Sequence, residues 1–295
     1  TPKAAETGAK DRNEKRIKGF KAQISTRSKS NDTWDDLKGN ERAKNALKDA
    51  IELPNLFPGL FVGKREPPRY ILLYGPPGTG KTMLARVAAN QVNADFLPIS
   101  PSSIKGGYVG DSERNVTSMF EAARQHAAET GRPVVIFIDE IDGIAPDRSG
   151  EAGKDVTTVG MVNTLLAEME GFSTDKTIKI FVLAATNYKE KVDSAVLSRF
   201  KQKIPIELPN VESVKAMMKN SFGPVPNMLE DSHYDRLAAT AVRERLSGRD
   251  ITSMFQDVTL QSVKRLKEED YVCVRSMAYV LDDSIQFVHA GRAET

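Results

Sequence analysis

Up to residue 208, short continuous runs of apolar residues alternate with stretches of helical spacing. Beyond residue 208, the apolar residues follow helical spacing only. Five runs have the length of buried strands: Tyr70–Tyr74, Phe96–Ile99, Val134–Ile138, Ile178–Ala185 and Lys203–Leu208. Apolar residues at three- and four-residue spacing between them predict helices over residues 35–53, 83–92 and 112–130. Strands that alternate with helices predict an α/β fold, with a parallel sheet covered by flanking helices.

Beyond Pro209 the pattern is helical only, which predicts a domain boundary at Pro209–Asn210. Helices are expected at Val211–Phe222, Asp231–Leu246 and Ser247–Lys267. We therefore predict a large α/β domain over residues 33–209 and a small, mainly helical domain over residues 210–295. The stretch Tyr271–Val288 fits a strand as well as a helix.

Residues 1–32 hold nine Lys or Arg against four Asp or Glu, so the rest of the chain has a net charge of −3. Only three large apolar residues lie in this segment, too few to offset the entropy cost of folding: Ile17, Phe20 and Ile24. We predict a basic flexible linker. A solvated linker and a contact for an acidic partner, such as a nucleic acid, an anionic membrane or an acidic protein tail, both fit this composition.

Composition narrows the class of protein further. With 40% hydrophobic and 28% charged residues among 295, the chain has the make-up of an ordinary globular protein. Its apolar runs are too short for a membrane span, and its single cysteine, Cys273, cannot form a disulfide within the chain. We expect a reducing compartment, the cytoplasm or the nucleus. The start, Thr1-Pro2-Lys3, suggests a piece of a longer protein.

Gly75–Thr82 reads GPPGTGKT, a match to the phosphate-binding P-loop, and it lies between a predicted strand and a predicted helix, as that motif requires. Glycines let consecutive backbone N–H groups face phosphate oxygens at the start of a helix. Lys81 is expected to reach the β- and γ-phosphates and Thr82 to bind Mg²⁺. A glycine-rich turn without a ligand is the alternative.

Two adjacent acids, Asp139 and Glu140, end the apolar run Val134–Ile138. Ligands of open α/β sheets bind at this end of the strands. Because side chains alternate along a strand, the two acids are expected to do different work: Asp139 in the shell of Mg²⁺, and Glu140 in polarising the attacking water. A plain strand end without function is the alternative.

Four segments together resemble the AAA ATPases: Gly75–Thr82, Ile136–Asp142, Ala184–Asn187 and Asp193–Phe200. The lead-in segments Trp34–Gly39 and Leu53–Gly63 are most similar to the meiotic clade, which contains katanin, spastin, fidgetin and the ATPase that disassembles ESCRT filaments. The resemblance covers about Trp34 to Lys267. It implies the P-loop NTPase fold with a small helical lid domain, and ATP and Mg²⁺ as cofactors.

The resemblance also assigns further residues. Asn187 corresponds to sensor 1 and Arg199 to the arginine finger, which acts on the nucleotide of a neighbouring subunit, so a homo-oligomeric ring, a hexamer, is implied. Taken alone, Asn187 would be a turn residue and Arg199 a surface residue. The implied nucleotide-binding residues are Gly39, Pro77, Gly78, Thr79, Gly80, Lys81, Thr82, Met83, Gly248 and Arg249.

Gly106–Gly110 aligns with the first pore loop of the family, which implies that Tyr108 and Val109 contact a protein substrate in the central pore. Asp147–Lys154 resembles the second pore loop, although a flexible connector has the same composition. Three features depart from the clade. Ser198 stands where a second arginine is common, Arg249 stands where a small residue is usual, and Ser284–Thr295 does not resemble the closing helix.

The combined reading is an ATP-hydrolysing ring that remodels, disassembles or unfolds a protein threaded through its pore. Two alternatives stay open. The chain could be a nucleotide-gated assembly scaffold with little turnover, or, given its basic segment, a nucleic-acid-associated ATPase. The three histidines are too scattered in the sequence to predict a metal site.

Overall fold

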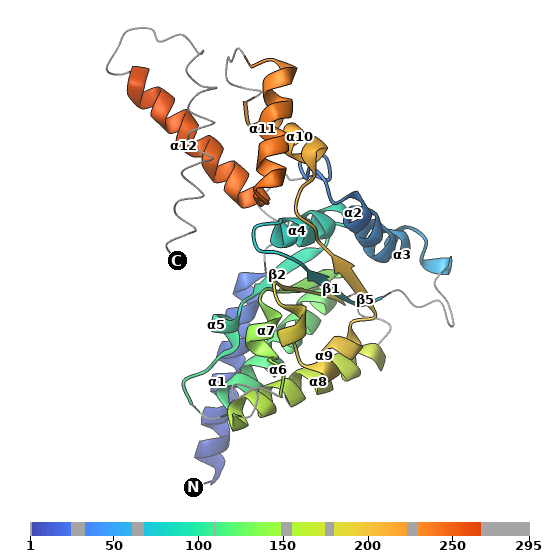
Figure 1. Cartoon of the computed structure of the whole chain (residues 1–295). Helices are drawn as coiled ribbons and strands as arrows, with labels where there is room; N and C mark the ends of the chain where they lie inside the picture. Colours follow the sequence, from blue (N-terminus) through green and yellow to red (C-terminus); the bar gives the residue numbers. More distant parts are fainter. Residues whose placement is uncertain are drawn as a thin grey trace. The chain divides into compact units, whose positions relative to one another are not determined.

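The computed structural model describes residues 2–24, 33–60, 68–108, 110–148, 155–174, 180–222 and 229–266. Contacts divide the chain into two compact units (Figure 1). The large unit comprises residues 1–36, 41–75 and 81–206, and the helical unit comprises residues 37–40, 76–80 and 207–295. The division after residue 206 lies close to the boundary expected from sequence at Pro209–Asn210, and each unit has a hydrophobic core of its own.

A parallel sheet of five strands forms the centre of the large unit. The strands are β1 (Tyr70–Tyr74), β2 (Asp95–Ile99), β3 (Val134–Ile138), β4 (Ile180–Thr186) and β5 (Gln202–Pro205), in the order β2-β3-β4-β1-β5. Every residue of β3 and β4 is buried, which accounts for their unbroken apolar runs. The predicted parallel α/β sheet is confirmed.

Helices flank this sheet (Figure 1). They are α2 (Glu41–Leu47), α3 (Leu53–Leu56), α4 (Lys81–Gln91), α5 (Pro101–Ile104), α6 (Asp111–Thr130), α7 (Ile141–Ile144), α8 (Val156–Thr174) and α9 (Ser194–Arg199), with a π-helix at Lys48–Glu52 and 3₁₀ turns at Pro58–Leu60 and Lys189–Lys191. The helix expected over residues 35–53 begins only at Glu41, because Gly39 and Asn40 both have positive φ. The sequence reading did not identify α8.

Residues 2–23 form a helix, α1 (Pro2–Gln23), where composition predicted a flexible linker. The prediction is wrong for this part of the segment. Ile17 and Phe20 lie three residues apart on one face of the helix, and Ile24 follows directly after its last residue. All three are buried in the core of the large unit. Three apolar residues are enough to hold this segment in place, because α6 packs against α1.

The helical unit contains α10 (Val211–Phe222), α11 (Asp231–Arg243) and α12 (Gly248–Leu266), close to the three helices predicted from sequence. Its core is formed by apolar residues at helical spacing, among them Val214, Met218, Leu237, Phe255 and Val258. The ambiguous stretch Tyr271–Val288 and the departing segment Ser284–Thr295 lie outside the described residues. No helix in the described part of the chain is long and apolar enough to cross a membrane.

Candidate nucleotide site

The P-loop begins directly after β1, at the carboxyl ends of the strands. The Gly75 N–H donates a 3.3 Å hydrogen bond to the carbonyl oxygen of Thr186, the last residue of the neighbouring strand β4. A Cβ added to Gly75 would lie 2.0 Å from the carbonyl oxygen of Ile206, and φ is +154°. Only glycine fits this position, so the chain can turn away from the sheet here.

Three candidate side chains of the large unit lie at this edge of the sheet. Lys81 opens α4 and is buried, and its Nζ donates a 2.8 Å hydrogen bond to the carbonyl oxygen of Gly75. The Thr82 hydroxyl donates a 3.0 Å hydrogen bond to Oδ2 of Asp139, which follows β3. The buried Lys81 ammonium thus belongs to the residue directly before Thr82, whose hydroxyl is paired with the Asp139 carboxylate.

These residues fit a magnesium nucleotide. A hydroxyl and a carboxylate oxygen in contact are hard oxygen ligands of the kind that Mg²⁺ prefers. Lys81 donates to the neutral carbonyl oxygen of Gly75, and phosphate oxygens would offer it charged acceptors. Hydrogen bonds within the chain hold both features in place.

Glu140 does not continue the strand. β3 ends at Ile138, and Glu140 has a left-handed backbone, with φ 49° and ψ 51°. Its N–H donates a 3.0 Å hydrogen bond to Oδ1 of Asp139, and its side chain is exposed. The expectation that Asp139 and Glu140 differ because side chains alternate along a strand is therefore wrong. The two acids differ because a tight turn separates them, with Asp139 turned toward Thr82 and Glu140 toward solvent.

Asn187 follows β4 and is half-buried. The preceding Thr186 donates a 2.6 Å hydrogen bond through its hydroxyl to Oδ1 of Asp142 and accepts a 2.9 Å hydrogen bond from the N–H of Tyr188. This pair joins the end of β4 to α7, which starts directly after Glu140. Sequence reasoning missed the role of Thr186 and Asp142, although both lie inside the quoted motifs.

The remaining P-loop residues, Pro76–Gly80, belong to the helical unit by their contacts. The carbonyl oxygen of Gly78 accepts a 3.1 Å hydrogen bond from the N–H of Arg249 in the first turn of α12. A Cβ on Gly78, where φ is +73°, would lie 2.3 Å from Oγ of Ser247. The Thr79 hydroxyl donates a 2.9 Å hydrogen bond to the carbonyl oxygen of Pro76. Glycine at position 78 is therefore required for the loop to approach the start of α12.

The other predicted nucleotide contacts of this unit lie close by. A Cβ on Gly39 would lie 2.4 Å from Oγ of Ser213, and one on Gly248 would lie 3.4 Å from the carbonyl oxygen of Gly78. Ser247 accepts a 3.3 Å hydrogen bond from the Asp250 N–H and so caps α12. Four further predicted positions differ in exposure: Pro77 and Arg249 are exposed, while Gly80 and, in the large unit, Met83 are half-buried.

Arg199 ends α9, and its guanidinium forms an ion pair with Glu170 of α8. The Arg199 side chain is 38% exposed. The neighbouring Ser198 hydroxyl donates a 2.6 Å hydrogen bond to the carbonyl oxygen of Ala195. It is engaged within its own helix and adds no positive charge beside Arg199.

The two segments that resemble pore loops are partly described. Tyr108 is 83% exposed, unusual for a large aromatic side chain, while Val109 lies outside the described residues. In the second segment, Nε of Arg148 lies 2.7 Å from Oδ2 of Asp193, and residues 149–154 lie outside the described residues.

Comparison with known proteins gives a consistent result. Residues 71–208 match the model of the ATPase family associated with various cellular activities (AAA). The chain is 38% identical over 240 residues to vacuolar protein sorting-associated protein 4 of Dictyostelium discoideum, covering 81% of this chain and 52% of that protein. It is 36% identical over 270 residues to Protein SUPPRESSOR OF K(+) TRANSPORT GROWTH DEFECT 1 of Arabidopsis thaliana, covering 90% and 60%.

Spastin of Xenopus laevis is 36% identical over 243 residues, covering 82% of this chain and 38% of spastin. The chain thus spans less than two thirds of the length of these relatives. Among solved structures, the FIGL-1 AAA domain in complex with ADP superposes with a TM-score of 0.77 at 28% identity, covering 93% of this chain and 90% of that domain. The motifs, the sheet and these relatives agree: the chain carries an ATPase domain of the AAA family, of the meiotic-clade type.

Proposed function

We propose that this chain binds ATP with Mg²⁺ and hydrolyses it in a ring of identical subunits that remodels a protein substrate. One observation carries the proposal: Lys81, Thr82 and Asp139 all lie at the carboxyl edge of the sheet, where the Thr82 hydroxyl is 3.0 Å from the Asp139 carboxylate. The ADP bound to the FIGL-1 AAA domain supports a nucleotide as the ligand.

Each residue has a separate task in this proposal. Lys81 binds the β- and γ-phosphates, and Thr82 and Asp139 hold Mg²⁺, which when bound neutralises phosphate charge. Glu140 accepts a proton from the water that attacks the γ-phosphorus, as the bond from that phosphorus to the bridging oxygen breaks. Asn187, beside the same edge, keeps that water in line.

The proposal of a ring and of a protein substrate rests on two residues, the half-buried Arg199 and the exposed Tyr108. Arg199 is half-buried at the end of a helix and accessible to a second copy, where its charge can stabilise a transition state. Tyr108 offers an exposed aromatic ring to an extended polypeptide. A reducing compartment such as the cytosol fits the single Cys273.

Replacing Glu140 with Gln tests the hydrolytic role. Glu140→Gln should retain ATP binding and lower turnover about 10²-fold or more, because the positioned proton acceptor is lost. Glu190→Gln, at an exposed acid in a 3₁₀ turn, is the matched control and should turn over normally. Steady-state phosphate release and equilibrium ATP binding are the measurements. Unchanged turnover in Glu140→Gln would exclude this residue as the base.

A further inference from the structure

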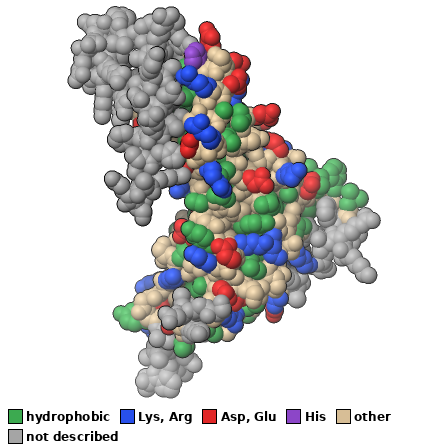
Figure 2. All heavy atoms as spheres, in the orientation of Figure 1, with side chains coloured by type: hydrophobic (Ala, Val, Ile, Leu, Met, Phe, Trp, Pro, Cys, Tyr) green, Lys and Arg blue, Asp and Glu red, His purple; other side chains and the backbone are tan. Residues whose placement is uncertain are grey.

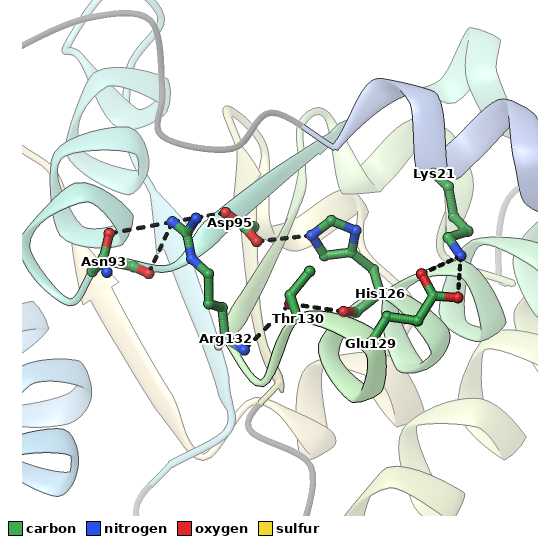
Figure 3. Close-up of polar contacts among 7 residues, drawn as sticks. All are labelled: Lys21, Asn93, Asp95, His126, Glu129, Thr130 and Arg132. Atoms are coloured by element: carbon green, nitrogen blue, oxygen red, sulfur yellow. Dashed lines mark hydrogen bonds and ion pairs between the residues drawn. The ribbon is translucent and has the colours of Figure 1, made fainter.

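α1 is docked on α6 by contacts that the nucleotide site does not use. The core of the large unit contains Ile17 and Phe20 of α1, and Ile24 directly after it. Polar contacts flank them. Asn13 accepts a 3.1 Å hydrogen bond from the Ser118 hydroxyl, and Nζ of Lys21 lies 2.7 Å from both carboxylate oxygens of Glu129 near the end of α6 (Figure 3).

One contact of α1 reaches the opposite end of α6. Nη2 of Arg16 lies 2.5 Å from Oδ1 of Asp111, the first residue of α6. These side chains are only 23% and 17% exposed, so water screens this charge-assisted hydrogen bond less than a surface pair. Among the described residues, Arg114 also forms an ion pair with Asp111, but it lies at 3.6 Å and is 62% exposed. Arg16 is therefore the main cationic partner of Asp111.

Asp111 also forms the base of the loop that carries Tyr108. The Asp111 N–H donates a 3.1 Å hydrogen bond to the carbonyl oxygen of Tyr108. A Cβ on Gly106, at the other end of the loop, would lie 2.2 Å from Cβ of Asp111. The next residue, Ser112, is buried and accepts a 3.1 Å hydrogen bond from the Gly106 N–H. Both ends of the loop therefore rest on the first turn of α6.

We propose that Arg16 is a positioning residue for the substrate-contacting loop, and that its ion pair with Asp111 couples the docking of α1 to the placement of Tyr108. This inference rests on the proposed function of Tyr108. When α1 undocks, Asp111 loses its nearer cation, and the first turn of α6 can shift, which moves the loop. Two residues of the basic segment thus have acidic partners within the chain: Arg16 pairs with Asp111, and Lys21 pairs with Glu129.

Amide hydrogen exchange tests the coupling on the whole chain. Arg16→Gln should speed exchange at the amides of Gly106 and Asp111 by about threefold or more, because their hydrogen bonds depend on the first turn of α6. Lys21→Gln is the matched control. It removes a different cation of α1, the one that pairs with Glu129 at the far end of α6, and should leave these two amides unchanged. Arg16→Lys keeps the charge and should restore slow exchange.

Two results would overturn the inference. One is unchanged exchange at both amides in Arg16→Gln. The other is an equal rise along all of α6, which would mean that α1 detaches as a whole and that Arg16 has no local effect. A circular dichroism melt shows whether each variant is folded.

A functional measurement separates this inference from the proposal on which it rests. Fluorescein-labelled casein, a protein without a stable fold, serves as the probe. Arg16→Gln should raise the casein concentration for half-maximal stimulation of ATP turnover severalfold while unstimulated turnover stays normal, and Lys21→Gln should not. If Tyr108→Ala responds to casein like the unsubstituted chain, the pore-loop function is wrong, and the exchange data still decide the role of Arg16.

Discussion

Asp95, the first residue of β2, shows how one buried charge can fix several elements. Its side chain is fully buried, with Oδ2 at 2.8 Å from Nε2 of His126 and Oδ1 at 3.0 Å from Nη2 of Arg132 (Figure 3). Arg132 also donates a 3.2 Å hydrogen bond to the side-chain oxygen of Asn93. This role of His126 could not be predicted from sequence spacing, because His126 and its partner Asp95 are 31 positions apart.

Removing this charge should destabilise the large unit. Asp95→Asn leaves Arg132 and His126 without their anionic partner, and we expect a loss of about 2 kcal/mol or more in the free energy of unfolding, at the lower end for broken buried pairs because Arg132 is partly exposed. Glu129→Gln, which breaks the exposed pair with Lys21, is the control and should cost less than about 1 kcal/mol. Urea unfolding measures both. Equal midpoints for the two variants would contradict this role of Asp95.

At the scale of elements, the buried strands could be predicted from sequence, because strands buried on both faces need continuous apolar runs such as Val134–Ile138. The P-loop could be placed because its glycines sit between a strand and a helix. The docking of α1 could not be predicted, because Ile17, Phe20 and Ile24 become part of a core only when α6 lies opposite. The turn at Glu140 was also hidden, because a non-glycine residue with positive φ leaves no pattern in the sequence.

The pair α10 and α11 shows how charges join neighbouring helices. Nζ of Lys219 lies 2.6 Å from Oδ1 of Asp231, and Nζ of Lys215 lies 2.6 Å from Oδ1 of Asp235. The hydrogen bond from Lys219 and the charges of both lysines lower the pKa of Asp231 below its ordinary value. Figure 2 shows acidic and basic side chains interspersed on the face in view.

A carboxylate with a lowered pKa stabilises the folded state above its unfolded pKa, about 3.9, and this stabilisation is lost as the pH falls through the folded value. The thermal midpoint of the helical unit should therefore fall on acidification below about pH 4, and fall less in Asp231→Asn. The effect should be small and weaken with salt, because the group is fully exposed. Melts between pH 7 and pH 2.5 measure it. An identical pH dependence in both proteins would contradict the assignment.

At the scale of the whole molecule, the proposed hydrolysis requires more than one chain. Lys81 and Glu140, the proposed phosphate-binding residue and the proposed base, lie at the sheet edge, whereas Arg199, at the end of α9, pairs with Glu170. A finger that acts in a neighbouring subunit predicts that activity depends on assembly. Arg199→Ala should bind ATP normally yet lose about 10³–10⁵-fold in turnover, or roughly 4–7 kcal/mol of transition-state stabilisation. Ser198, engaged with Ala195, offers no replacement charge.

Mixing two inactive variants tests this central claim most directly. Lys81→Ala lacks the ammonium proposed to bind phosphate and keeps the proposed finger, whereas Arg199→Ala lacks the proposed finger and keeps its P-loop. In a mixed assembly, some subunit boundaries pair an intact P-loop with an intact finger, so steady-state ATP turnover should rise well above that of either variant alone. Native electrophoresis establishes that the two variants assemble together. Co-assembly without recovered turnover, or normal turnover of Arg199→Ala alone, would contradict a ring in which Arg199 acts on its neighbour.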